Sequence, residues 1–185
     1  MAKGISSTRG KPMDRRGFLR TSAGSLAGAL ALPAIVSSAT LGLNARAAAS
    51  DRITIGLIGM GKQMGSHLST MLGRGDTQVL AVCDVESVRL EMAQARANDY
   101  YAGQSGSNGG KTVDAYKDFR ELCARDDIDA VLIATPNHWH AIPVVEAVKN
   151  GKDIYLEKPQ ARTIRECQAI VNAVRRYGRV FQQGS

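Results

Sequence analysis

Beyond residue 50 the chain alternates between two hydrophobic patterns. Short apolar runs predict buried strands over residues 52–59, 77–84, 129–136, 153–159 and 179–184. The intervening segments repeat apolar residues at helical spacing. The first helical face comprises Met64, His67, Leu68, Met71 and Leu72. Further helices are predicted near residues 86–100, 116–124, 137–149 and 164–178. Apolar strands that alternate with helices predict an α/β fold, with a parallel sheet covered on both faces.

The formal net charge of +7 is concentrated near the N-terminus. Residues 1–47 carry seven basic residues and one acidic residue, whereas the remainder carries 17 basic and 16 acidic residues. The nearly neutral remainder argues against a nucleic-acid-binding surface on the folded part.

The basic segment has the pattern of an export signal. Arg15 and Arg16 precede Phe18 and Leu19, and a stretch of small and apolar residues follows over 23–43. The sequence Ala-Arg-Ala at 45–47 is a small-x-small cleavage pattern. We therefore predict a Tat-type signal over residues 1–47, read by the Tat translocase, and a periplasmic or exported domain over 48–185. Cleavage after residue 49 and an uncleaved membrane anchor are the alternatives.

The cysteines do not form a recognisable framework. Cys83, Cys123 and Cys167 are odd in number, lie within apolar patterns and include no C-x-x-C pair. This pattern argues against a disulfide scaffold and a zinc site, and favours buried small side chains.

A glycine-rich turn joins the first predicted strand to the first helix. Gly59 and Gly61 occupy the first two positions of a G-x-G-x-x-x-G pattern that ends at Gly65. The predicted phosphate-binding residues of this turn are Gly59, Met60, Gly61, Lys62 and Gln63. Small residues let a pyrophosphate approach the amide groups at the helix start. Alone the pattern is weak, because glycine is common at strand–helix turns.

An acidic residue at the end of the second strand strengthens this prediction. Asp84 lies 19 residues after Gly65, where a carboxylate can accept hydrogen bonds from the ribose of a dinucleotide. Its alternative role is to cap the following helix. Because an acid would repel a 2′-phosphate, NAD is favoured over NADP, although the nearby Arg89 keeps NADP open.

Two further motifs follow the third and fourth long strands. Residues 134–141 read ATPNHWHA and residues 155–159 read YLEKP. Together with the glycine turn, over residues 51–185, they resemble the Gfo/Idh/MocA family of NAD(P)-dependent oxidoreductases. The resemblance implies a Rossmann-type doubly wound parallel sheet and a sugar or polyol substrate.

The resemblance also implies roles for individual residues. Lys158 would lie near the nicotinamide and polarise or protonate the substrate oxygen, with Glu157 supporting its charge and geometry. Pro159 would fix its direction. The turn formed by Thr135, Pro136 and Asn137 would contact the nicotinamide side of the cofactor, and His140 matches the motif histidine. His138 and His140 are spaced i, i+2, so we predict no metal site.

The resemblance further implies a second α+β domain that binds substrate and mediates homo-oligomer contacts, and this sequence is predicted to be a partial chain without it. Two other functions remain open. One is an NAD-dependent glycoside hydrolase of the same architecture, in which relatives tend to lose the lysine corresponding to Lys158. The other is a non-catalytic dinucleotide-binding module.

Overall fold

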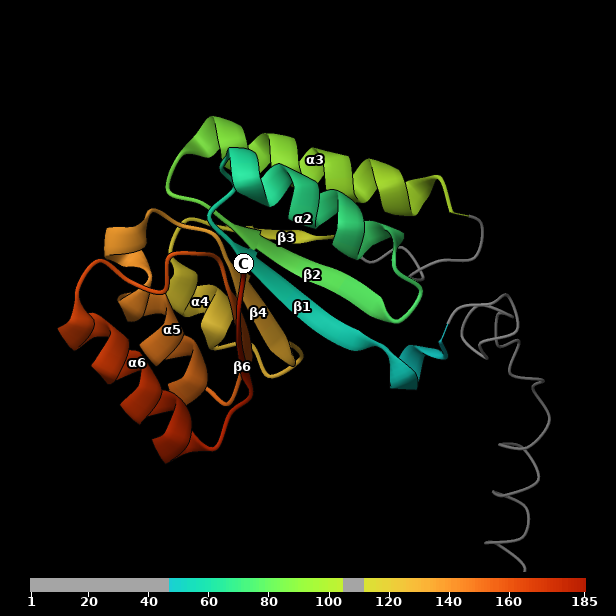
Figure 1. Ribbon diagram of the computed structural model, residues 1–185. Helices are drawn as coiled ribbons and strands as arrows, with labels where there is room; N and C mark the ends of the chain where they lie inside the picture. The colour runs from blue at the N-terminus through green and yellow to red at the C-terminus, as the bar shows by residue number, and fades with distance from the viewer. Residues whose placement is uncertain (1–46, 105–111) are drawn as a thin grey trace, which may run out of the picture. The chain divides into compact units, whose positions relative to one another are not determined.

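The computed structural model describes residues 47–104 and 112–185 (Figure 1). The strands are β1 (Ile53–Ile58), β2 (Thr77–Cys83), β3 (Asp114–Tyr116), β4 (Ala130–Ile133), β5 (Asp153–Leu156) and β6 (Phe181–Gln183). The α-helices are α2 (Lys62–Gly73), α3 (Ser87–Ala102), α4 (Phe119–Cys123), α5 (Ala141–Lys149) and α6 (Ile164–Tyr177). Within the described residues, the 3-10 helices are η1 (Ala49–Asp51) and η3 (Asn137–Trp139). The predicted signal, apart from residue 47, lies outside the described residues.

The six strands form one sheet in the order β3-β2-β1-β4-β5-β6, and every neighbouring pair is parallel. The predicted doubly wound parallel sheet is thereby confirmed. Because the chain leaves β1 toward β2 and β3, and later returns to pair β4 with β1, the order reverses between β1 and β4. At such a point, connections diverge at the carboxyl ends of the strands and leave a crevice.

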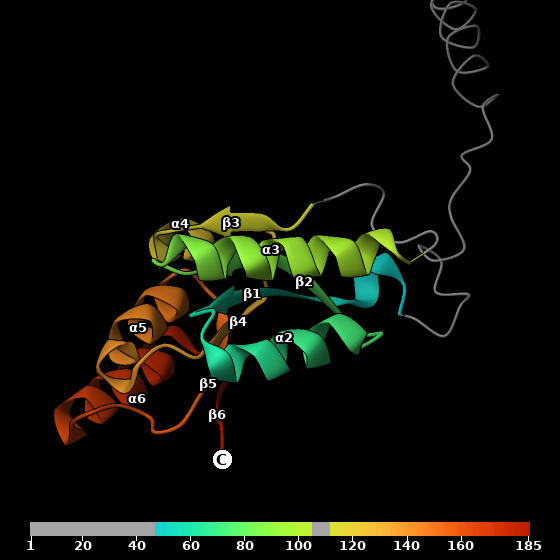
Figure 2. The same cartoon turned by 90° about the horizontal axis from the view of Figure 1, so that it is seen from above.

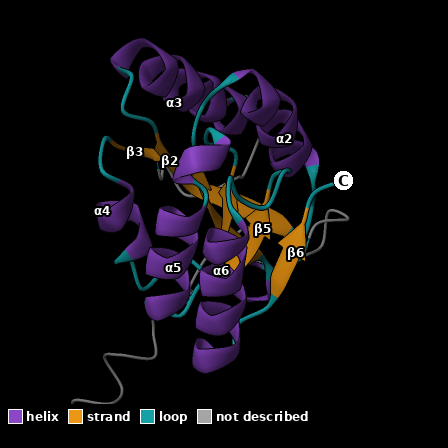
Figure 3. Cartoon of the chain, turned by 60° about the vertical axis from the view of Figure 1, so that its left-hand side comes forward, coloured by secondary structure: helices purple, strands orange, loops and turns teal. Residues whose placement is uncertain are grey.

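The helices cover both faces of the sheet. Helices α2 and α3 lie together on one face (Figure 2), where Met64, Leu68 and Ala97 pack against buried strand residues. Helices α4, α5 and α6 lie side by side on the other face (Figure 3), with Leu122 and Ile170 fully buried. Burying both faces explains why the strands are almost continuously apolar. Within the described ranges, no helix is long and apolar enough to span a membrane.

Helix α6 shows how local sequence fixes an element's ends. The Thr163 hydroxyl accepts a hydrogen bond from the Glu166 amide, and the Glu166 carboxylate accepts one from the Thr163 amide. This reciprocal pair is a capping box. Gly178, in the left-handed conformation, ends the helix.

The structure corrects the predicted element boundaries in three places. The short strand β3 was missed, and Tyr116, assigned to a helix, belongs to it. Helix α4 begins only at Phe119, because Asp118 caps it by accepting from the Arg120 amide. The helix predicted over 137–149 is divided into η3 and α5, and β5 ends at Leu156.

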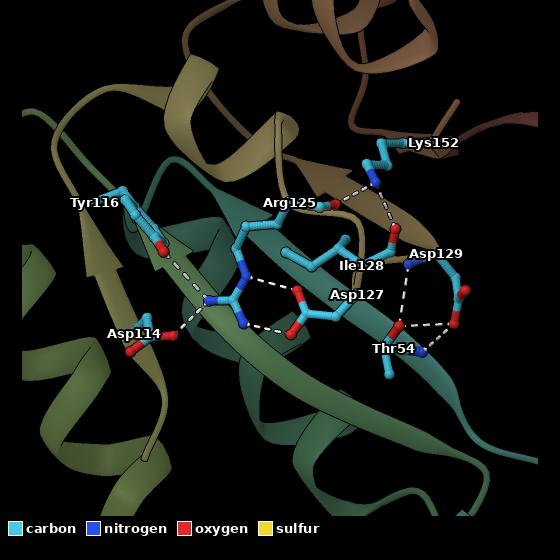
Figure 4. A network of polar contacts seen from close by, with 8 residues as sticks. All are labelled: Thr54, Asp114, Tyr116, Arg125, Asp127, Ile128, Asp129 and Lys152. Carbon is cyan, nitrogen blue, oxygen red and sulfur yellow. Dashed lines mark hydrogen bonds and ion pairs between the residues drawn. The ribbon is translucent and has the colours of Figure 1, made fainter. Parts of the chain in front are cut away.

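A polar network ties the amino ends of the strands together (Figure 4). The buried Lys152 ammonium donates to the carbonyl oxygens of Ile128, at 2.8 Å, and Arg125. The Arg125 guanidinium forms a bidentate ion pair with Asp127. Since these residues precede β4 and β5, the network fixes the sheet at the edge opposite the carboxyl ends.

Candidate cofactor-binding site

A cleft of about 730 Å³ lies at the carboxyl ends of the strands. Its walls come from the connections that follow β1, β2, β3 and β4. Seven of the predicted cofactor-binding residues line it, namely Gly59, Gly61, Lys62, Gln63, Asp84, Thr135 and Pro136. The other predicted residues, Met60, Asn137, His140, Glu157 and Lys158, are not part of this lining. The cleft thus brings together residues that are 77 positions apart in sequence.

The two glycines of the turn serve different purposes. Gly59 has a φ of +90°, and a Cβ there would lie 2.9 Å from the main-chain atoms of Ala134 and Thr135. Glycine is therefore required where the end of β1 meets the end of β4. Gly61 has no other atom within 4 Å of the position of a Cβ. It precedes α2 without a side-chain cap, so the first amides of this helix are available to an anion.

Asp84, directly after β2, holds the glycine turn in place by a hydrogen bond. It is buried, and its Oδ2 accepts a hydrogen bond of 2.6 Å from the Met60 amide, while Oδ1 accepts from the Glu86 amide at 2.8 Å. The capping role that was the alternative for Asp84 belongs instead to Glu86, whose carboxylate accepts from two amides of α3. Asp84 still lines the cleft, and its ribose contact stays a prediction.

Glu157 lies directly after β5 and is buried. One carboxylate oxygen lies 2.6 Å from His67 Nε2, and the other accepts from the Lys158 amide at 3.0 Å. Gln63 Nε2 approaches the same carboxylate at 3.4 Å. These contacts join the turn after β5 to the first turns of α2. Lys158 itself is exposed, and its peptide bond to Pro159 is cis. Because Lys158 closely follows β5, and β5, β4 and β1 run parallel, it lies at the same edge of the sheet as the glycine turn.

The environment of Glu157 favours its ionised form. Burial opposes ionisation, but the hydrogen bonds from His67 and the Lys158 amide outweigh it and hold the pKa of the Glu157 carboxyl below its usual range. A charged carboxylate accepts stronger hydrogen bonds than a neutral one, so it holds the Lys158 main chain more firmly.

His67 is a site residue that the sequence reasoning missed. We assigned it to an apolar helical face, whereas the structure pairs it with Glu157 and sets its ring edge against Tyr155, 5.6 Å between ring centroids. The available signal was a titratable side chain in a helical face whose other members are apolar. Such a residue needs a polar partner when it faces the sheet.

His140 joins the turn after β4, which lines the cleft, to the turn after β5. It is 1 % exposed, and its Nδ1 and Nε2 each lie 2.7 Å from a carbonyl oxygen, those of Pro159 and Thr135. The ring therefore bridges the turn after β4 to the turn after β5. The neighbouring His138 and Trp139 are exposed and line the cleft. Among the described residues, no group of three histidine, cysteine, aspartate or glutamate side chains could hold a metal ion.

A parallel sheet of this strand order, with a glycine turn after β1 and an acid after β2, defines a dinucleotide-binding Rossmann domain. The sequence comparison is more specific. Residues 53–185 match the family model described as "Oxidoreductase family, NAD-binding Rossmann fold", and the chain belongs to this family, Gfo/Idh/MocA. The resemblance and the NAD cofactor predicted from sequence are thereby confirmed for the domain.

Individual relatives agree with the family. The chain is 31 % identical over 177 residues to a glycosyl hydrolase family 109 protein of Shewanella baltica, covering 89 % of this chain and 37 % of the relative. An NAD binding oxidoreductase from Klebsiella pneumoniae has a TM-score of 0.59 and 27 % identity, over 72 % of this chain and 34 % of that one.

A scyllo-inositol dehydrogenase from Lactobacillus casei, solved with NAD(H) and scyllo-inositol, has a TM-score of 0.61 and 23 % identity. That alignment covers 72 % of this chain and 36 % of the dehydrogenase, and it shows a shared fold. The chain thus spans little more than a third of the length of these relatives.

The residues of the cleft fit a dinucleotide. The uncapped amides of α2 and the exposed Lys62 can bind a diphosphate beside Gly61, where no side chain intrudes. Thr135 Oγ1 is a buried side-chain oxygen that has no hydrogen-bond partner within residues 47–104 and 112–185. A buried hydroxyl without a partner at the cleft is a group that a bound ligand can satisfy.

Proposed function

We propose that this chain is the cofactor-binding part of an exported oxidoreductase that acts on a sugar or polyol. The observation that carries the proposal is the link from Glu157 to Gln63 and His67. Through it, the turn that presents Lys158 is joined to the helix that begins at the glycine turn. Bound NAD would supply or accept the hydride.

The chain's own residues would divide the remaining work. The Lys158 ammonium would donate a hydrogen bond or proton to the substrate oxygen, because it is the nearest flexible cation after β5. Glu157 would position it by holding its main-chain amide. Asp84 would act twice, by fixing the glycine turn through the Met60 amide and by accepting from the ribose.

The first experiment is a titration of the purified chain with NADH. The chain contains one tryptophan, Trp139, which lines the cleft and reports binding through its fluorescence. We expect saturable quenching for the unaltered chain and a similar affinity for Lys158→Ala. In the full-length protein, Lys158→Ala should abolish turnover. An unaltered chain that does not bind at millimolar cofactor would contradict the proposal.

The glycosyl hydrolase relatives favour a second candidate, an NAD-dependent glycosidase in which the cofactor undergoes no net change. Lys158 favours net oxidation or reduction, since the resemblance implies that such hydrolases tend to lack this lysine. Absorbance at 340 nm during turnover by the full-length protein separates the two. A steady change accompanies net redox chemistry, and a constant value accompanies hydrolysis.

We also propose that residues 1–47 direct export through the Tat translocase. The adjacent Arg15 and Arg16 and the small-x-small sequence at 45–47 support this. The double variant Arg15→Lys/Arg16→Lys should retain the protein in the cytoplasm, whereas Arg20→Lys, outside the pair, should not. Undiminished export of the double variant would contradict a twin-arginine signal. On the resemblance alone, the full-length protein is proposed to be a homo-oligomer, which light scattering can measure.

A further inference from the structure

The start of α3 forms part of the cleft wall, immediately after Asp84. Glu86 caps this helix, and its carboxylate accepts from the amides of Val88, at 3.0 Å, and Arg89, at 3.1 Å. The same carboxylate forms an ion pair with the Arg89 guanidinium, whose Nε lies 3.5 Å away. Glu86 and Arg89 both line the cleft.

The amides of Val88 and Arg89 and the Arg89 guanidinium are donors of the kind that bind a phosphate monoester. Helix-terminal amides combined with a guanidinium form a strong anion site, because the helix dipole and the cation act together. In this chain the protein's own carboxylate occupies that arrangement. The Glu86 carboxylate therefore saturates the amides and neutralises the nearest arginine.

The position of the Glu86 carboxylate bears on which dinucleotide can bind. In a Rossmann domain the acid that ends the second strand accepts from the ribose 2′-hydroxyl. The start of α3 lines the same cleft as Asp84, so it is the part of the wall that follows this acid in sequence. A second negative charge stands there, because Glu86 lies two residues beyond Asp84.

We propose that Glu86 is a specificity-determining residue that excludes NADP from the cleft. Its carboxylate pairs with Arg89 and adds a negative charge to the cleft wall, so a 2′-phosphate would have to compete with it for Arg89. Substituting Asp84 to admit NADP would also remove the hydrogen bond that holds the glycine turn, because the Met60 amide donates to its carboxylate. Cofactor choice therefore depends on the residue that caps α3 as well as on Asp84, and the inference rests on dinucleotide binding at this cleft.

The test compares dissociation constants for NADP and NAD in the full chain, read by Trp139 fluorescence. Glu86→Ser keeps a good helix cap but removes the charge and releases Arg89. We expect the affinity for NADP relative to NAD to rise at least about tenfold. Glu86→Gln, which preserves the side-chain length, provides a second variant. The matched control is Glu91→Gln, which removes an exposed charge from the same helix outside the cleft lining.

Two further measurements identify the mechanism. Adding Arg89→Ala to Glu86→Ser should abolish the gain, and raising the salt concentration should weaken it, since the new contact is between charged, exposed groups. A gain that persists without Arg89 would overturn the proposed receptor. An unchanged ratio in both Glu86 variants would overturn the inference alone. Absence of NAD binding by the unaltered chain would overturn the dinucleotide site and this inference with it.

Discussion

Gly59 and Gly61 are two residues apart in one turn, yet the structure itself requires glycine only at Gly59. At Gly59 the requirement is internal, since both its φ and the adjacent main chain of β4 forbid a side chain. At Gly61 the conformation suits other residues, with a φ of −72°, and the space around it is open. We therefore predict that glycine matters at Gly61 for ligand binding and not for the fold.

Alanine substitutions should separate these two requirements. Gly59→Ala should lower the free energy of unfolding by about 1–3 kcal/mol or more, because it combines backbone strain with a main-chain clash. Gly61→Ala should change it by no more than about 1 kcal/mol, the cost of an alanine at a helix cap, while weakening NAD binding. Urea unfolding and NADH titration measure the two effects. Equal losses of stability in both variants would contradict this assignment.

Glu157 should make stability depend on pH. Because its pKa in the folded protein lies below the ordinary value of 4.5, its contribution is present above that value and is lost as the pH falls through the folded-state pKa. Glu157→Gln should lower the unfolding free energy at pH 7 by about 1.5–3 kcal/mol, as expected for hydrogen bonds to a charged group. The difference should shrink between pH 5 and pH 3 in urea titrations. A difference that stays constant with pH, as for the exposed Glu91→Gln, would contradict this role.

At the scale of elements, the sequence predicted the strands and helices that carry an apolar pattern and missed the strand that carries none. The long apolar strands and the helix α6 were recognisable, since burial of both sheet faces imposes their patterns. Strand β3 has only three residues and none is buried, so its sequence, Asp-Ala-Tyr, carries no strand pattern. Its pairing with β2 comes from the tertiary structure.

The candidate site likewise divides into local motifs, which the sequence shows, and long-range contacts, which it does not. The glycine turn, Asp84 and the two motifs after β4 and β5 could be found along the chain, because each is local. The contact of His67 with Glu157 spans 90 residues, and that of His140 with the Pro159 carbonyl spans 19. Such links depend on how α2, β4 and β5 are arranged, which no local pattern specifies.

Lys152, at the amino ends of the strands, provides a test of how much one buried polar contact between elements contributes to stability. Lys152 is 5 % exposed, and its ammonium satisfies two carbonyl oxygens in the connection before β4. Lys152→Met keeps the apolar stem and leaves both oxygens without this donor. At about 1–3 kcal/mol for each buried acceptor, we expect a loss of about 2–4 kcal/mol. Lys149→Met, at an exposed position of the preceding helix, is the control, and equal stability of the two variants would contradict the role of Lys152.

At the scale of the molecule, the core between the sheet and helices α4 to α6 holds two free thiols. Burial raises the pKa of Cys83 to about 12, with a further contribution from the Asp84 charge, and burial likewise raises that of Cys123 to about 12. Cys167 is less buried. Since the thiolate is the reactive form, the two core thiols should react only when the helices leave the sheet.

Thiol labelling of the native chain can therefore report cofactor binding to the whole domain. We expect Cys167 to react first with a disulfide reagent at neutral pH, and Cys83 and Cys123 to react at a rate set by unfolding. NAD at about 100 times its dissociation constant adds about 2.7 kcal/mol to the free energy of unfolding, so it should slow labelling of Cys123 about a hundredfold. Cys83 lines the cleft, so bound NAD should slow its labelling at least as much. Labelling of Cys167 should be unchanged, which provides an internal control. Core thiols that react as fast as Cys167, or that gain no protection from NAD, would show that the sheet and its helices do not open as one unit.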